Sequence, residues 1–112
     1  MTANTLAPKA IGVLSLDVTG PHLLRGERVI TELAQRRGYT LTGLVTIGDD
    51  TFMPTALIVG TARSKGAVVV IAPSMAHFSS RVRAIAVACD LITPHRFVAC
   101  TGTDRSRSPR HE

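Results

Sequence analysis

The chain has 112 residues, of which 45% are hydrophobic and 4% aromatic, so it can bury one modest core that is mainly aliphatic. Its formal net charge of +5 permits binding to nucleic acid or to an acidic partner, but it selects neither. The sequence shows no apolar run long enough to cross a membrane and no signal-peptide pattern, which predicts a single cytoplasmic domain with no membrane association.

Strand-like and helix-like segments alternate from the N-terminus onward. We expect residues 1–9 to be a flexible lead and residues 10–16 to form the first strand. A loop is expected over Asp17–Gly20, and apolar residues at helical spacing then predict a helix over Pro21–Arg37. Residues 39–47 are expected to form the second strand.

The central feature of the chain is the run of β-branched residues Val68–Ile71, which follows a turn over Gly48–Asp50 and a second predicted helix over Pro54–Ser64. Such a run is typical of a strand buried on both faces, and the helical patterns on either side predict a central position in a parallel sheet. Pro73 ends this strand, because proline has no amide hydrogen to donate to a neighbouring strand.

Residues 74–80 (SMAHFSS) are predicted to form a loop at the carboxyl end of the central strand. In open α/β sheets, ligands bind at this edge. Ser79 or Ser80 can cap a third helix. The apolar face of that helix recurs at helical spacing and consists of Val82, Ile85, Ala86 and Cys89.

After Pro94, residues 95–100 are expected to form the last strand, and residues 101–112 a disordered tail. The order β-α-β-α-β-α-β predicts an α/β fold over residues 10–100. We expect a small three-layer sandwich with a mostly parallel four-stranded sheet in the flavodoxin-like order.

Three sequence features together resemble the catalytic domain of the resolvase/invertase (serine recombinase) family. They are Ile11-Gly12 at the start of the first strand, a second strand ending in Gly48-Asp49, and the stretch VVVIAPSMAHFSS over residues 68–80. Their order and spacing are similar to that family over residues 10–100, and in particular to the degenerate recombinase-like domains of actinobacterial proteins. The resemblance implies a resolvase-like fold.

The same resemblance assigns the family's functional positions to residues of this chain. The family's first strand reads roughly I-G-Y-x-R-V-S-T, in which the arginine binds phosphate and the serine attacks it; here these positions hold Ser15 and Asp17. The arginine of the family's Arg-Pro pair is replaced by Met53. The family's D-R-L-x-R motif falls on Ala76, His77, Phe78, Ser79 and Ser80.

Phosphoryl transfer depends on electrostatic stabilisation of an anionic centre, which these replacements remove. An aspartate at the nucleophile position would also repel a DNA phosphate. We therefore expect a catalytically inactive, resolvase-like binding or regulatory module with no cofactor and no metal. Its expected partner is a second copy or another protein, and DNA is an additional, weakly bound candidate. The candidate phosphate-binding residues are Arg25, Arg28, Arg81 and Arg83, which can equally be solvated surface.

Several alternatives remain open at the level of the sequence. A small enzyme could use Asp17 and His77 for phosphate or nucleotide chemistry, although Asp17 also suits a turn and His77 a polar loop position. Asp17 could hold magnesium together with Asp49-Asp50 if the loops converge. Cys89 and Cys100 are expected to be two buried thiols, with a disulfide or metal pair as the less favoured interpretation. A zinc site would need the set His77, Cys89, His95 and Cys100, which lacks the usual ligand spacing.

Overall fold

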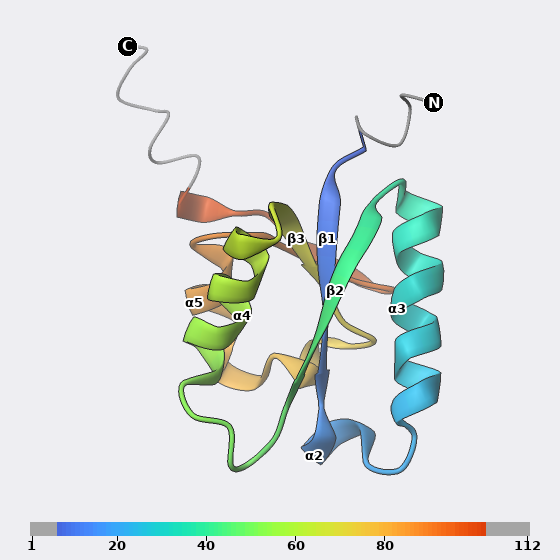
Figure 1. Cartoon of the computed structure of the whole chain (residues 1–112), viewed down its shortest axis with the longest axis vertical. Coiled ribbons are helices and arrows are strands. Elements are labelled where there is room, and N and C mark those ends of the chain that lie inside the picture. The colour runs from blue at the N-terminus through green and yellow to red at the C-terminus, as the bar shows by residue number, and fades with distance from the viewer. Residues whose placement is uncertain (1–6, 103–112) are drawn as a thin grey trace.

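The computed structural model describes residues 7–102 and contains one five-stranded mixed sheet in the order β2-β1-β3-β4-β5 (Figure 1). The strands are β1 (Lys9–Ser15), β2 (Thr40–Ile47), β3 (Ala67–Ile71), β4 (Asp90–Thr93) and β5 (Arg96–Val98). Strands β1 to β4 run parallel to one another, and β5 runs antiparallel to β4. A mostly parallel sheet in the flavodoxin-like order is therefore confirmed.

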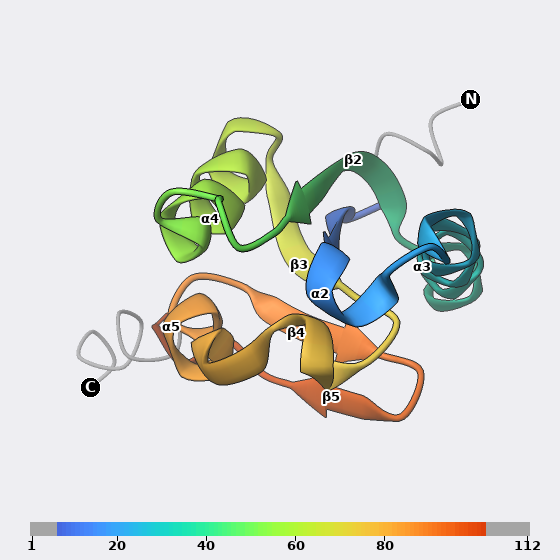
Figure 2. The ribbon, with the colours of Figure 1, turned by 90° about the horizontal axis from the view of Figure 1, so that it is seen from below.

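Helices cover both faces of the sheet, as the view along the strands shows (Figure 2). Helix α3 (Leu23–Arg37) packs on one face, and its Ile30 and Leu33 bury Leu14 of β1. Helices α4 (Pro54–Ser64) and α5 (Val82–Ala86) pack on the other face, over a second cluster that contains Phe78. The expected three-layer arrangement is confirmed.

Strand β3 lies between β1 and β4, as the β-branched run predicted. Val69, Val70 and Ile71 are completely buried. Val68, however, is 52% exposed, so burial on both faces is wrong for this residue. The cause is a register shift: Lys9 pairs with Ala67 and Ala10 with Val69, which leaves Val68 as the extra residue of a bulge.

The C-terminal part of the fold differs from the expectation of four strands. Helix α5 ends at Ala86, and Asp90–Thr93 forms a strand that the sequence pattern did not indicate. Pro94 and His95 are the turn of a hairpin in which Thr93 pairs with Arg96. This short connection permits only an antiparallel return, so the last strand is the short edge strand β5 rather than a strand over residues 95–100.

Two helix starts and one loop also differ from the expectation. Helix α3 begins at Leu23 rather than Pro21, and α5 has Arg81 as its N-cap rather than Ser79 or Ser80. The expected loop after β1 is the short helix α2 (Leu16–Thr19), which Gly20 ends with a φ of 53°. Glycine adopts this left-handed conformation without steric cost.

The two ends of the described chain also differ from the expectation. Lys9, expected in the lead, begins β1, and Thr101 and Gly102, expected in the tail, lie within a helical turn. The rest of the predicted lead and tail, residues 1–6 and 103–112, lies outside the described residues. Across residues 7–102, every helix is too short or too polar to span a lipid bilayer.

The burial difference within β3 gives a matched pair of substitutions. We expect Val69→Asp to unfold the domain, because an uncompensated buried charge costs about 3–5 kcal/mol. Val68→Asp, in the exposed bulge, should lower the free energy of unfolding by less than about 1 kcal/mol. Urea unfolding followed by circular dichroism measures both. Equal destabilisation by the two variants would contradict the central, bulged position of β3.

Candidate functional site

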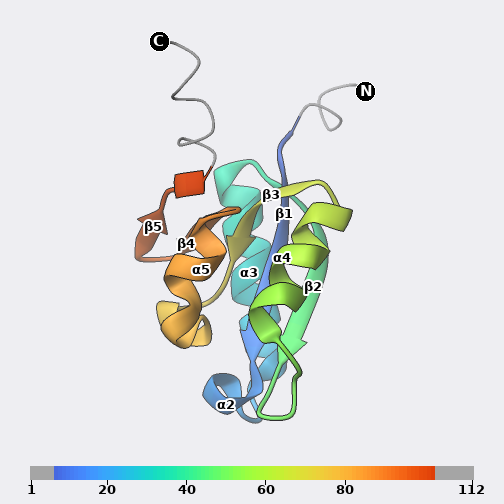
Figure 3. The same ribbon diagram turned by 90° about the vertical axis from the view of Figure 1, so that its left-hand side faces the viewer.

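The carboxyl edge of the sheet carries the candidate site, because three parallel strands end there beside one another. Helix α2 follows β1, the loop 48–53 follows β2, and the 3₁₀ turns η1 (Met75–His77) and η2 (Ser79–Arg81) follow β3. The loop 48–53 and α2 lie at the same end of the molecule in two perpendicular views (Figures 1 and 3). The predicted place of the site, next to the residues after β3, is therefore where the strand ends converge.

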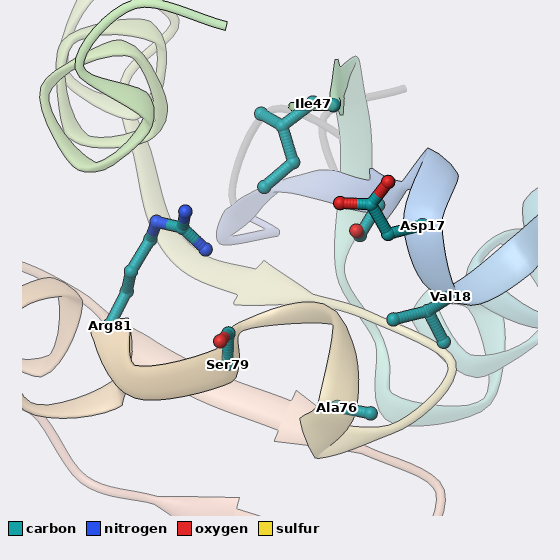
Figure 4. A pocket seen from close by; sticks show the side chains of 8 residues that line it. Asp17, Val18, Ile47, Ala76, Ser79 and Arg81 are labelled. Atoms are coloured by element: carbon teal, nitrogen blue, oxygen red, sulfur yellow. The ribbon is translucent and has the colours of Figure 1, made fainter. Parts of the chain in front are cut away.

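One hollow of about 140 Å³ opens at this edge, and we call it the Asp17 hollow (Figure 4). Its lining comes from α2, the end of β2 and the turns after β3. The lining residues are Ser15, Asp17, Val18, Ile47, Gly48, Ala76, Ser79 and Arg81. The carboxyl group of Asp17 and the guanidinium of Arg81 lie on opposite walls, so the hollow has one acidic and one basic side.

Asp17 interacts with a second acid from the loop after β2. A side-chain hydrogen bond with Asp49 raises the pKa of Asp17 above its usual value, and partial desolvation and the charge of Asp49 raise it further. A second carboxyl group close by disfavours the charged form of the first, which is the direction of this shift. The position that the family resemblance gives to a nucleophile is thus occupied by half of an acid pair.

His77 lies in the segment after β3, as predicted, and is buried there, with 3% of its surface exposed. Its Nδ1 accepts a hydrogen bond of 2.9 Å from the backbone N–H of Ser15. An imidazole that accepts at Nδ1 is neutral and carries its proton on Nε2. Burial lowers the pKa of His77, which favours the same neutral form. His77 therefore links the end of β1 to η1.

A second hollow, of about 200 Å³, lies on the other side of α2, and we call it the His77 hollow. It is lined by Val18, Thr19, His22, Arg25, Gly26, Val29, Pro73 and His77. Val18 lines both hollows, whereas Asp17 lines only the first of them and His77 only the second. The structure thus does not bring Asp17 and His77 to one cavity.

The remaining positions of the resemblance have different surroundings. Ala76 lines the Asp17 hollow. Ser80 is exposed, and its chain neighbours Ser79 and Arg81 line the same hollow. Met53 precedes α4 with a φ of 49° and is 57% exposed. Ser15 is buried and its backbone is held by His77. No arginine or lysine stands at these positions.

The four candidate arginines do not form one basic stripe. Arg25 lines the His77 hollow, Arg28 lies beside Glu27 and Glu32 at a third hollow on α3, and Arg81 lines the Asp17 hollow. Arg83 is exposed on α5. Because α3 and α5 cover opposite faces of the sheet, Arg28 and Arg83 belong to different surfaces.

Neither predicted metal set is assembled. Within the described part of the chain, no group of three or more histidine, cysteine, aspartate or glutamate side chains could hold a metal ion. Asp17 and Asp49 meet, as the magnesium alternative required, but without a third ligand. Cys89 is a buried thiol, as expected, whereas Cys100 is only half-buried.

Sequence reasoning missed an apolar surface at the same edge, which we call the edge patch. It consists of Leu16, Val18, Phe52 and Met53, whose exposed fractions are 45%, 46%, 85% and 57%. Leu16 lies against the loop 48–53, since a Cβ added at Gly48 would be 3.4 Å from its Cδ1. The sequence could have indicated this surface, because it places two adjacent large apolar residues, Phe52-Met53, between an acidic turn and a helix.

Comparisons with known proteins do not add a relative, because no family model, no curated protein and no solved structure matches this chain. The likeness to the resolvase/invertase family rests on the sequence positions given above. The fold and the carboxyl-edge geometry come from the structure itself.

The Ser15–His77 hydrogen bond predicts a pH dependence of stability. The unfolded chain gains a proton on His77 as the pH falls through 6.5, whereas the folded chain gains it only at a lower pH. The free energy of unfolding should therefore fall as the pH drops from 6.5 toward the folded-state pKa. The difference between wild type and His77→Gln, measured by urea unfolding from pH 7.5 to 5, isolates this effect, because glutamine can accept from Ser15 without titrating.

His95→Gln is the matched control, because His95 is exposed. It should keep the pH dependence of the wild type. His77→Ala should lower the free energy of unfolding by about 1–3 kcal/mol at neutral pH, since it leaves the Ser15 amide without its acceptor. An unchanged pH dependence in His77→Gln would show that the His77 proton is not linked to folding.

Proposed function

We propose that this chain is a protein-binding or regulatory module built on a resolvase-like domain without strand-exchange activity. One observation carries the proposal. Where a recombinase would hold a phosphate, this chain places the Asp17–Asp49 acid pair, and the exposed apolar side chains of the edge patch stand beside it. The strand order β2-β1-β3-β4 agrees with the order that the family resemblance implies.

The chemistry of the carboxyl edge argues against phosphoryl transfer. Asp17 supplies no positive charge to stabilise a phosphorane-like centre, and Arg81 is a single cation on the far wall. The hydroxyl of Ser15 is not a substitute nucleophile that His77 could activate. The Nδ1 of His77 is already occupied by the Ser15 amide, and the ring opens to the other hollow.

The edge patch supports a protein partner. Isolated exposed apolar residues are common on protein surfaces, but a group of large ones on two adjoining segments is typical of an interaction site. Asp49 and Asp50 are exposed next to the patch in the same loop. We therefore expect the partner to present an apolar contact with a basic rim, which another protein supplies more readily than a nucleic acid does.

A small enzyme that uses Asp17 and His77 together has less support. The two side chains line different hollows on either side of α2, and His77 is engaged by the backbone. A general acid and base must reach the same substrate, which this arrangement does not provide.

The loss of strand exchange can be tested directly. We expect the purified protein to form no covalent adduct with duplex DNA, and Asp17→Ser to form none either. The phosphate-binding arginines are still missing at Ser15, Met53, His77 and Ser80. Denaturing gels of labelled DNA incubated with each protein report an adduct. An adduct with the wild type would overturn the proposed inactivity, and one with Asp17→Ser would show that the rest of the site is competent.

The edge patch can be tested with a matched pair of exposed phenylalanines. Phe52 is 85% exposed in the patch, and Phe97 is 52% exposed on β5 at the far edge of the sheet. We expect Phe52→Ser to weaken association about tenfold or more, because a buried aromatic anchor contributes about 2 kcal/mol to an interface. Phe97→Ser should leave it unchanged. Sedimentation velocity measures self-association, and quantitative pull-down from host extract measures a different partner.

Titration of labelled duplex DNA at low and at moderate salt distinguishes DNA binding from the proposed protein binding. If the arginines serve DNA, binding should fall steeply with salt, and Arg81→Ala with Arg83→Ala should weaken it equally for every sequence. Binding of that kind, together with equal association of Phe52→Ser and Phe97→Ser, would overturn the protein-binding proposal. The absence of DNA binding, together with weaker association of Phe52→Ser but not of Phe97→Ser, would support the protein-binding proposal.

A further inference from the structure

The two cysteines come together at the open end of the β4–β5 hairpin. Its pairs are Thr93 with Arg96, Ile92 with Phe97, and Leu91 with Val98. The ladder ends there: the backbone N–H of Cys89 donates to the carbonyl oxygen of Ile85 at 3.0 Å, so the segment before β4 is still a helical turn.

After β5 ends, Cys100 contacts Val87 and Asp90, the residues that flank Cys89 and its neighbour Ala88. The backbone N–H of Cys100 donates to Oδ1 of Asp90 at 2.7 Å, so Cys100 is still beside the start of β4. The Sγ of Cys100 lies 3.4 Å from the carbonyl oxygen of Val87, two residues before Cys89. A Cβ added at Gly102 would lie only 1.9 Å from the same oxygen, which shows how closely the returning segment approaches Val87.

The two thiols also differ in accessibility. Cys89 is 3% exposed and belongs to the core under α4 and α5, whereas Cys100 is half-buried. Burial raises the pKa of the Cys89 thiol, and the charge of Cys100 raises it further, which agrees with a short distance between them. Cys100 is therefore the thiol that a reagent in solution meets first.

We propose that Cys89 and Cys100 are a redox pair that forms a reversible intramolecular disulfide with a small-molecule disulfide, of the glutathione class, as oxidant. The Cys100 thiolate attacks one sulfur of the oxidant, and one thiolate leaves and takes up a proton. The Cys89 thiolate then attacks the Cys100 sulfur of the mixed disulfide and releases the second thiol. Two protein thiols are oxidised, and one small disulfide is reduced to two thiols.

The disulfide would act on the least supported part of the sheet. Strand β5 has three residues and pairs only with β4 at the edge. A covalent link from Cys100 to Cys89 would fix the end of β5 to the segment that joins α5 and β4. We therefore expect oxidation to slow local opening of the hairpin while the carboxyl edge of the sheet, at the other end of the strands, stays unchanged. This inference does not depend on the proposed protein-binding function.

The experiment compares the folded chain with Cys100→Ser and Cys89→Ser in glutathione buffers of stepwise ratio, under nitrogen at neutral pH. Non-reducing peptide mapping and intact mass report the products. We expect the wild type to become a monomer with a Cys89–Cys100 disulfide, at a yield about tenfold higher in buffer than in urea at the same ratio, because folding holds the two thiols together. Cys89→Ser should stop at the mixed disulfide on Cys100, and Cys100→Ser should stay reduced.

Two further readouts keep the test decisive if a cysteine variant folds poorly. Circular dichroism of the oxidised wild type should match that of the reduced protein, and hydrogen exchange should slow within β4 and β5 on oxidation. The proposal is overturned if the wild type yields only glutathione adducts or intermolecular disulfides. It is equally overturned if the Cys89–Cys100 link forms only after the chain is unfolded.

Discussion

The hydrogen bond from the Ser15 amide to Nδ1 of His77 joins the ends of two neighbouring strands, and the candidate site depends on it. It sets the position from which α2 leaves β1 and from which η1 leaves β3. A buried, neutral imidazole makes this link without bringing a charge into the core, which would be costly. His77, at a position to which the resemblance would give an arginine, thus makes a structural contact between strand ends.

The division of the carboxyl edge follows from that link. With His77 held toward Ser15, α2 separates a hollow lined by Asp17 from one lined by His77. On the first side, the turn after β2 brings Asp49 against Asp17, so negative charge gathers where a phosphate would need positive charge. The same turn exposes Phe52 and Met53. An acidic pair beside an apolar surface suits a protein contact better than phosphate chemistry.

The β4–β5 hairpin brings together two cysteines that lie 11 residues apart in the sequence. Cys89 and Cys100 lie in segments with different local patterns, and neither occurs in a recognisable motif. The turn at Pro94-His95 folds the chain back on itself, and Cys100 then contacts Val87 and Asp90, on either side of Cys89. This approach depends on a strand, Asp90–Thr93, that is too short to leave a periodic signal.

Local patterns in the sequence predicted the alternation of elements, the central position of β3 and the edge at which the candidate site lies. These follow from strong local causes: the β-branched run Val68–Ile71, the missing amide of Pro73 and the helical spacing of apolar residues. The sequence also singled out Asp17 and His77, because they stand at strand ends where ligands usually bind. The identity of these residues was visible, but their partners were not.

Which side chains meet depends on how the strands and loops pack together. Burial of His77 depends on the approach of β1 to η1, and the acid pair depends on the parallel arrangement of β1 and β2, which brings Asp49 to Asp17. The bulge that exposes Val68 and the hairpin that returns the chain toward Cys89 are likewise set by register between strands. Strand register and the convergence of loops depend on packing across the whole sheet. They therefore cannot be predicted from any short segment of the sequence.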